Sequence, residues 1–223
     1  MARAGEHERG RGWIGTGLGA SASRRGVSVW LVFLLVLFGV PFVGAAQAAG
    51  TATDAMRSTI NDVIRIVEDQ DLKKPTRSME RRKMLEKVVG DRFSYEEMAK
   101  RSLGAQWPKL TDKERQEFVD LFTSLLTATY AQKVEGYTGE QVHYLSERLD
   151  GGYAEVKTKV ASAKLEVPLD YRLLTKNGDW RVYDVVVDNV SLVSNYRGQF
   201  TKILRTSSFK DLIEAIRKKV EKP

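Results

Sequence analysis

The sequence predicts an α+β fold, with helices on one face of a curved, four-stranded antiparallel sheet. Apolar residues recur every three or four positions in the segments before residue 136 and after residue 191. Between residues 141 and 187 they alternate with polar residues, which is typical of strands with one buried face. Helices first, strands next and helices last is the order of an α+β domain rather than of alternating βα units.

Residues 1–48 are expected to form a signal peptide. Two arginines precede an apolar run at 27–43, and a small-x-small cleavage pattern follows at 46–48. The alternative is an uncleaved anchor, because the run approaches the length needed to cross a bilayer. The cleavage pattern favours removal, which leaves residues 49–223 as one domain.

The composition restricts the possible chemistry. The chain has 36 basic and 29 acidic residues; without the leader's five arginines and two glutamates, 31 and 27 remain, a net charge of +4. This balance does not require nucleic acid as a partner. There is no cysteine, and only His143 lies outside the leader, so disulfides, cysteine nucleophiles and multi-histidine metal sites are excluded. We expect no metal and no cofactor.

The first half of the domain is expected to be helical. A first amphipathic helix precedes the break at Lys74-Pro75, and a second begins near Ser78 and ends at Gly90. Two capping boxes, at 94–97 and 111–114, mark further helix starts. The second of these opens the longest helix, which we expect to reach about residue 135.

Four strands should follow, joined in the order of the sequence. The turn signals are Asp-Gly-Gly at 150–152 and Asn-Gly at 177–178. Pro168 has no amide hydrogen, so its strand should lie at an edge or carry a bulge. The last strand reaches the corner Asp188-Asn189, where asparagine tolerates a left-handed backbone, and runs into a helix from about Ser191. A final helix is expected from about Ser208.

No residue pattern indicates an enzyme. Asp184 and Asp188 would lie on one strand face roughly 13 Å apart, beyond the ~5–9.5 Å of a glycosidase pair. A buried Asp184 could act as an acid or base, but an ion pair with an arginine such as Arg197, or a bond to a helix N-terminus, explains it better. His143 is expected to be a strand-surface imidazole. There is no nucleophile elbow, phosphate loop or paired metal ligand.

Two strings of residues resemble the MlaC, or toluene-tolerance, family of periplasmic phospholipid-binding proteins. One is W-x-V-Y-D-V-x-V-x-x-V-S-L-V-x-N-Y-R-x-Q-F at 180–200. The other comprises Phe93, Met98, Ala99, Leu103, Gly104, Trp107, Thr111, Glu114, Phe118, Phe122, Leu125, Leu126, Thr129 and Tyr130. The chain departs from the family at Asn189, where glycine is frequent. The resemblance spans about residues 55–220.

The resemblance implies an NTF2-like sheet that encloses a hydrophobic cavity for lipid. From pattern alone the aromatic and aliphatic stripes would be ordinary core; the family instead implies a lipid-lining role. The implied lipid-binding residues on the sheet are Ala154, Val156, Thr158, Val160, Leu165, Val167, Leu169 and Tyr171. Those on helices are Phe118, Phe122, Leu125, Leu126, Tyr130, Phe200 and Leu204. Ala154 and Thr158 are small, which suggests room for a ligand. Basic residues near the mouth could include Lys133 or Arg197.

The expected function is a soluble periplasmic phospholipid carrier without enzymatic activity, working in a lipid asymmetry pathway. Burying one sixteen-carbon tail contributes roughly 12 kcal/mol, at about 0.8 kcal/mol per methylene. The family implies as partners an inner-membrane ABC transporter complex with an MCE-domain protein and an outer-membrane lipoprotein–porin complex. Two alternatives remain: a binding protein for another hydrophobe (hopanoid, fatty acid or aromatic solvent), and an NTF2-like enzyme that uses Asp184.

Overall fold

The computed structural model describes residues 50–162 and 165–221, all within one compact unit. The predicted signal peptide lies outside the described residues. Among those described, no helix has the length and apolar character needed to cross a bilayer.

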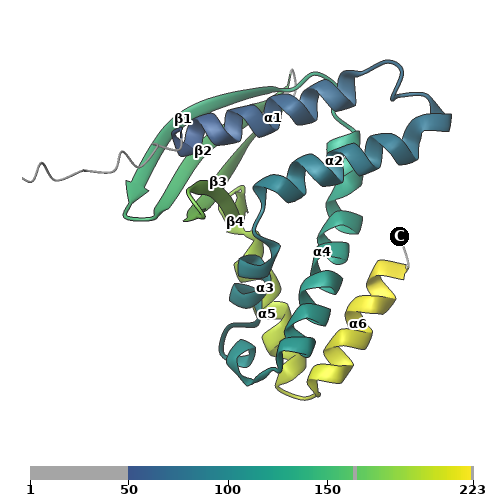
Figure 1. Ribbon diagram of the computed structural model, residues 1–223, viewed down its shortest axis with the longest axis vertical. Helices are drawn as coiled ribbons and strands as arrows, with labels where there is room; N and C mark the ends of the chain where they lie inside the picture. The colour runs from purple at the N-terminus through teal and green to yellow at the C-terminus, as the bar shows by residue number, and fades with distance from the viewer. Residues whose placement is uncertain (1–49, 163–164, 222–223) are drawn as a thin grey trace, which may run out of the picture. The chain divides into compact units, whose positions relative to one another are not determined.

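Six α-helices are present in the described part of the chain (Figure 1). Their bounds are α1 Ala52–Glu68, α2 Ser78–Arg92, α3 Tyr95–Leu103, α4 Asp112–Glu135, α5 Leu192–Leu204 and α6 Phe209–Glu221. A 3-10 turn at Pro75–Arg77 separates α1 from α2, where the Lys74-Pro75 break was predicted. The expected end of α2 at Gly90 is wrong: α2 continues to Arg92, because Phe93 still donates its amide hydrogen to the Val89 carbonyl.

The strands form one antiparallel sheet in the order β1-β2-β3-β4-β5. Their bounds are β1 Gln141–Asp150, β2 Tyr153–Ala161, β3 Glu166–Lys176, β4 Asp179–Val187 and β5 Val190–Ser191. The α+β prediction is confirmed, with a fifth, two-residue strand added. That strand forms because Asp188 (φ 48°) and Asn189 (φ 64°) are both left-handed, so the chain turns back to pair with β4 before α5 begins.

The turn predicted at Asn177-Gly178 is confirmed, with positive φ at both residues (54° and 78°), as a two-residue hairpin requires. Gly151, in the other predicted turn, also has positive φ (57°). Both hairpins therefore connect neighbouring strands in sequence order.

Pro168 lies in β3, which is a central strand, and not at the edge of the sheet. It pairs with Lys159 of β2. Next to this pair the backbone ladder is replaced by side-chain bonds: the Thr158 amide donates to Asp170 Oδ1 (3.2 Å), and the Thr158 hydroxyl donates to the Leu169 carbonyl. The Pro168 carbonyl accepts from the Asp188 amide (3.0 Å), so the side of Pro168 that lacks an amide hydrogen faces Asp188, just beyond the end of β4, and no bond between β2 and β3 is lost there. The two side-chain bonds instead satisfy the Thr158 amide and the Leu169 carbonyl. They also explain why Thr158 is fully buried without reference to a ligand.

One of the two predicted capping boxes is present. Thr111 and Glu114 bond reciprocally at the start of α4, with the Thr111 amide 2.8 Å from Glu114 Oε2. The box at Ser94 is wrong, because no side-chain cap forms there. The Ser94 amide instead donates to the Val182 carbonyl (2.8 Å), where residue 93 bridges to β4.

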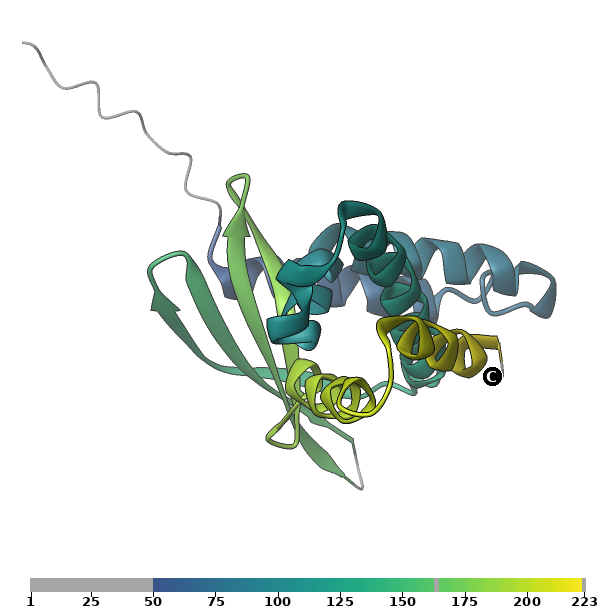
Figure 2. The same ribbon diagram turned by 90° about the horizontal axis from the view of Figure 1, so that it is seen from below.

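The helices lie to one side of the sheet (Figure 2). Helix α1 crosses the sheet, whereas α3, α4, α5 and α6 pack side by side near the β4 edge (Figure 1). Buried residues form three clusters: one among α3–α6, one between α1 and the sheet, and a small one joining the ends of α1, α2 and α4.

Candidate functional site

The candidate site is built on the sheet face that α1 covers, called here the inner face. Residues directly opposite each other in antiparallel strands share a face, so the register defines it. Its members are Val142, Tyr144, Glu147, Leu149, Ala154, Val156, Thr158, Val160, Val167, Leu169, Tyr171, Leu173, Val182, Val185 and Val187. Seven of the eight sheet residues predicted from sequence are among them; Leu165 precedes β3.

One end of the inner face is closed by protein. Ala52 and Met56 of α1 pack there against Val156, Leu173 and Val182. The exposed fraction of each of these five side chains is 1% or less. This end is ordinary core.

The other end of the inner face is apolar but only half-buried. Val160 pairs with Val167, and neither they nor Leu169 and Val185 are fully buried. Leu165, just outside the strand, is 63% exposed. Adjacent apolar side chains of this kind, continuous with a closed core, are the part of the sheet that a hydrophobic ligand could cover.

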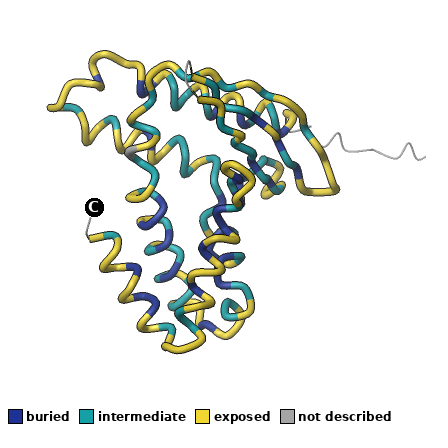
Figure 3. Tube along the Cα trace, turned by 180° about the vertical axis from the view of Figure 1, so that it is seen from behind, coloured by how far each residue is buried: buried dark blue, intermediate teal, exposed yellow. Residues whose placement is uncertain are grey.

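The predicted helical residues lie in a different cluster. Phe118 and Phe122 of α4 stack on each other (ring centres 5.7 Å apart), and Phe200 of α5 meets both edge-on (5.6 and 5.8 Å). Tyr196 contacts Phe122 (5.2 Å). All four rings are at most 3% exposed. Figure 3 shows buried positions gathered on the facing sides of these helices, whereas much of the sheet is intermediate.

The remaining helical members border this cluster. Leu125 and Leu126 are buried in it, and the half-buried Tyr130 and Leu204 pack against it. Burial, and to a lesser extent the neighbouring Tyr196, raises the pKa of Tyr130. The structure therefore brings the predicted residues together in two groups, a sheet group and a helical group. That all of them line a lipid site stays a prediction.

Two tyrosines place phenolic hydroxyl groups on the inner face, where the other polar side chains, Thr158 and Glu147, already bond to the protein. Burial raises the pKa of Tyr171 far above its ordinary value, with a smaller effect from Tyr144. Burial also raises the pKa of Tyr144, although Arg57 opposes this. The Tyr144 hydroxyl is buried and has no hydrogen-bond partner in the described part of the chain. Sequence reasoning missed Tyr144 and Arg57; the signal was the alternation of β1, which places Tyr144 inward.

Asp184 joins the sheet to α5. It is 3% exposed. Its Oδ2 accepts from the Ser191 hydroxyl (2.6 Å) and from Arg172 (3.1 Å), and its Oδ1 accepts from the Val193 amide (3.0 Å) at the start of α5. The expected helix N-terminus is thus its partner, but the arginine is Arg172 and not Arg197. With three donors on the carboxylate, the geometry is that of a structural group.

Arg197 and Lys133 are both exposed, and Arg197 Nε donates to the Arg101 carbonyl (2.6 Å). His143 is exposed on β1, as expected for a strand surface. Within the described ranges no three His, Asp or Glu side chains are grouped so that they could hold a metal ion.

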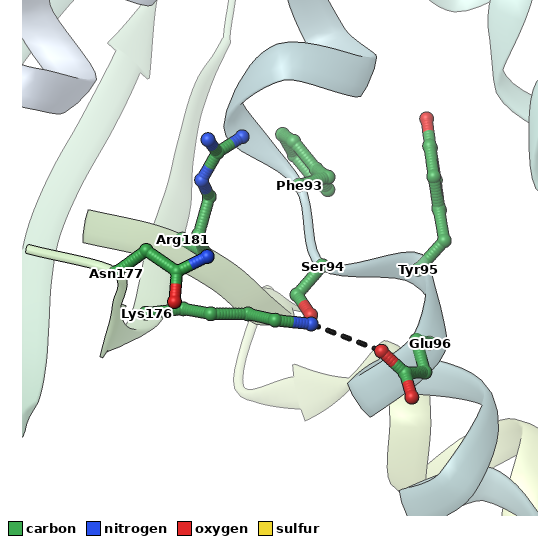
Figure 4. Close-up of a pocket in the computed structure, with 7 residues that line it drawn as sticks. All are labelled: Phe93, Ser94, Tyr95, Glu96, Lys176, Asn177 and Arg181. Atoms are coloured by element: carbon green, nitrogen blue, oxygen red, sulfur yellow. Dashed lines mark hydrogen bonds and ion pairs between the residues drawn. The ribbon is translucent and has the colours of Figure 1, made fainter. Parts of the chain in front are cut away.

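Two surface hollows lie away from the inner face. One, of about 250 Å³, is formed where the β3–β4 hairpin meets the start of α3, and Lys176 Nζ lies 2.9 Å from Glu96 across it (Figure 4). The other, of about 820 Å³, lies along α4 and α6 beside the Arg217–Glu117 ion pair. Neither is lined by residues of the predicted lipid set, and each contains an ion pair between two of its lining residues.

Comparison with known proteins connects this geometry to a family. The family model described as MlaC protein matches residues 57–218. The intermembrane phospholipid transport system binding protein MlaC of Haemophilus influenzae is 24% identical over 127 residues, which cover 54% of this chain and 59% of that protein's length. The chain therefore spans less than two thirds of that relative.

A solved structure shares the fold. It is a phospholipid-binding protein from Ralstonia solanacearum, in complex with a phospholipid, with a TM-score of 0.68 and 23% identity. The match covers 76% of this chain and 97% of the Ralstonia chain. Because the family model extends over most of the chain, including α1, the sheet and the closing helices, this protein belongs to the MlaC family.

Proposed function

We propose that this protein binds phospholipid by its acyl tails and carries it as a soluble protein. The observation that carries the proposal is the half-buried apolar end of the inner face, around Val167 and Leu169, in a chain of the MlaC family. The names of the Haemophilus and Ralstonia proteins support phospholipid as the ligand. Acyl chains would cover this apolar surface, and each buried methylene contributes about 0.8 kcal/mol.

The finer proposal is a periplasmic carrier between the outer and inner membranes. Its partners would be an inner-membrane ABC transporter complex with an MCE-domain protein and an outer-membrane lipoprotein–porin complex. Hydrolysis of ATP would then belong to the transporter. The predicted signal peptide and the intermembrane system named for the Haemophilus relative support this placement.

The proposed ligand-contacting surface is the sheet group at its half-buried end. Val160, Val167, Leu169 and the exposed Leu165 would contact acyl chains directly. Ala154 and Val156 would form the closed end, under α1. The helical group would border the site through Tyr130 and Leu204, the two members that remain half-buried.

The alternatives are weaker on this geometry. An enzyme using Asp184 would need a free carboxylate oxygen, but both oxygens already accept hydrogen bonds from the protein. Another hydrophobic ligand, such as a hopanoid or a fatty acid, would fit the same apolar surface, and the experiment must separate it from phospholipid.

Solvent extraction of natively purified protein, followed by mass spectrometry, tests the proposal. We expect stoichiometric two-chain phospholipid. Recovery of a sterol-like molecule or of fatty acid alone would identify a different ligand, and an empty protein would contradict the proposal.

A pair of variants tests the assigned face. Val167→Glu places a carboxylate against the acyl chains and should remove most of the bound lipid, because an unpaired charge is costly in an apolar site. Lys157→Glu introduces the same group at an exposed position of β2 that faces away from α1. Equal lipid retention in the two variants would show that the face is wrongly assigned.

A further inference from the structure

Arg57 is an exposed arginine on α1 beside the inner face. Its guanidinium carbon lies 4.0 Å from the ring centre of Tyr144 on β1. It forms no ion pair with any carboxylate in the described segments. Arg65, two turns later on the same helix, is bound to Asp62 at 2.8 Å. Arg57 is therefore a fixed cation whose hydrogen-bonding groups are available to a ligand.

Tyr144 extends from this exposed arginine into the interior. Its ring faces Arg57, and its hydroxyl is buried without a partner. On the inner face it lies opposite Thr158, whose own hydroxyl is already bound to the Leu169 carbonyl. A buried hydroxyl that lacks an acceptor destabilises the free protein, so an acceptor supplied by a ligand would be favoured.

Tyr171 adds a second phenol nearby. It lies on the inner face of β3 and is 8% exposed. No hydrogen bond of its hydroxyl occurs in the described structure, and Tyr144 lies close enough to contribute to raising the pKa of Tyr171, although burial is the larger cause. The apolar inner face thus carries two phenolic donors, and a cation stands at the outer side of one of them.

From the interior outward, the protein presents an apolar surface, then phenolic hydroxyls, then a guanidinium. A phospholipid presents acyl tails, then ester carbonyls, then a phosphate. A lipid whose tails lie on the apolar inner face has ester carbonyls as its first hydrogen-bond acceptors, followed by an anionic phosphate. Phenols can donate to carbonyls, and a guanidinium binds phosphate through paired N–H groups. We propose that Tyr144 and Arg57 form a polar anchor for the ester and phosphate of the bound lipid, with Tyr171 as a second donor.

This inference rests on the proposed function and adds a point of recognition between tail and head group. It gives the site a preference for anionic glycerolipids with an ester linkage over hydrocarbons of equal length. Because the anchor binds the ester and the phosphate, which all glycerophospholipids share, selectivity among head groups should stay low.

The test uses the delipidated mature protein and displacement of a fluorescent fatty-acyl probe. The ligands are dioleoylphosphatidylglycerol, dioleoylglycerol and oleic acid. Arg57→Gln should weaken binding of the phosphatidylglycerol about 5- to 10-fold and of the diacylglycerol less than about 2-fold, because only the first carries the phosphate. The matched control, Arg148→Gln, removes an exposed arginine of β1 and should change neither affinity.

Tyr144→Phe should weaken both ester lipids about 3- to 10-fold while leaving the thermal midpoint of the lipid-free protein unchanged or higher. A purely structural tyrosine would lower that midpoint instead. Unchanged lipid affinity in this variant would overturn the anchor.

The remaining outcomes are also decisive. If Arg57→Gln loses the same affinity for phosphatidylglycerol as for diacylglycerol, the arginine does not bind the phosphate. A loss confined to oleic acid would assign the anchor to a free carboxylate. If the wild-type protein binds neither ester lipid, the proposed function itself fails; if it binds both and the variants match it, only the anchor fails.

Discussion

The helical cluster and the inner face are both apolar, but only the helical cluster is completed by the protein itself. In the helical cluster four aromatic rings contact one another at 5.2–5.8 Å and are almost fully buried. On the inner face, α1 closes one end and leaves valines and leucines half-exposed at the other. The helical cluster is packed on all sides, as in an ordinary protein core. The open end of the inner face has apolar side chains that no other element of the described structure fully covers.

This difference separates two roles that share one composition. Phe122 and Leu169 are both large apolar residues of the predicted lipid set, yet Phe122 is fully buried and Leu169 is not. Substitutions in the helical cluster should therefore change stability, and substitutions at the open end of the inner face should change lipid content.

The largest effect is expected for Phe122→Ala. The ring contacts Phe118, Tyr196 and Phe200, so its removal leaves a cavity that the neighbouring helices cannot readily fill. We expect a loss of about 3–5 kcal/mol in the free energy of unfolding, measured with urea. Lipid per folded molecule should stay near that of the wild type. A large loss of lipid at full stability would instead place Phe122 in the lipid site.

Asp184→Asn tests the joint between the two regions. The substitution keeps the shape of the side chain but removes the charge that Arg172, Ser191 and the Val193 amide bond to. We expect a loss of about 1–3 kcal/mol in unfolding free energy, from the weakened charge-assisted bonds. Circular dichroism melts measure it. An unchanged melting curve would contradict the structural role.

The sequence predicted the order and type of the elements because their periodicity is local. The corner at Asp188-Asn189 could be placed from residue type alone, and so could the turn at Asn177-Gly178. The family resemblance was confirmed over most of the chain.

Features that depend on distant partners could not be predicted from sequence. Pro168 is tolerated in a central strand because its nitrogen faces Asp188, just beyond the end of β4, where no ladder bond is needed. Ser94 fails as a cap because β4 engages its amide. The separation of the predicted site residues into two clusters depends on how α3–α6 pack, and helical periodicity identifies a buried face without saying what covers it.

Leu169→Ala should lower lipid content more than stability, whereas Phe122→Ala should lower stability more than lipid content. Leu169 is only half-buried, so its truncation should cost about 1 kcal/mol or less in unfolding free energy of the lipid-free protein. Lipid recovered after purification should fall measurably, because an acyl chain would lose its contact with this side chain. If stability falls as far as in Phe122→Ala and lipid is retained, the open end of the inner face is ordinary core.

The smallest effect concerns the start of α4, which belongs to the helical region alone. Thr111→Ala removes the hydroxyl bonds of the reciprocal cap and should cost about 1 kcal/mol in unfolding free energy. Ser94→Ala should cost less than about 0.5 kcal/mol, because Ser94 forms no side-chain cap.

The same cap predicts a pH dependence. The backbone and side-chain bonds from Thr111 lower the pKa of Glu114, so its contribution is present above the ordinary glutamate pKa and is lost as the pH falls through the lowered value. The stability difference between Thr111→Ala and the wild type should therefore be larger at neutral pH than in acid, and lipid content should be unaffected at every pH where the protein is folded. Paired urea titrations at neutral and acidic pH measure the difference. A constant gap would show that the bond from the Thr111 hydroxyl to the Glu114 carboxylate adds nothing to the cap, because the bond from the residue 111 amide is present in both proteins.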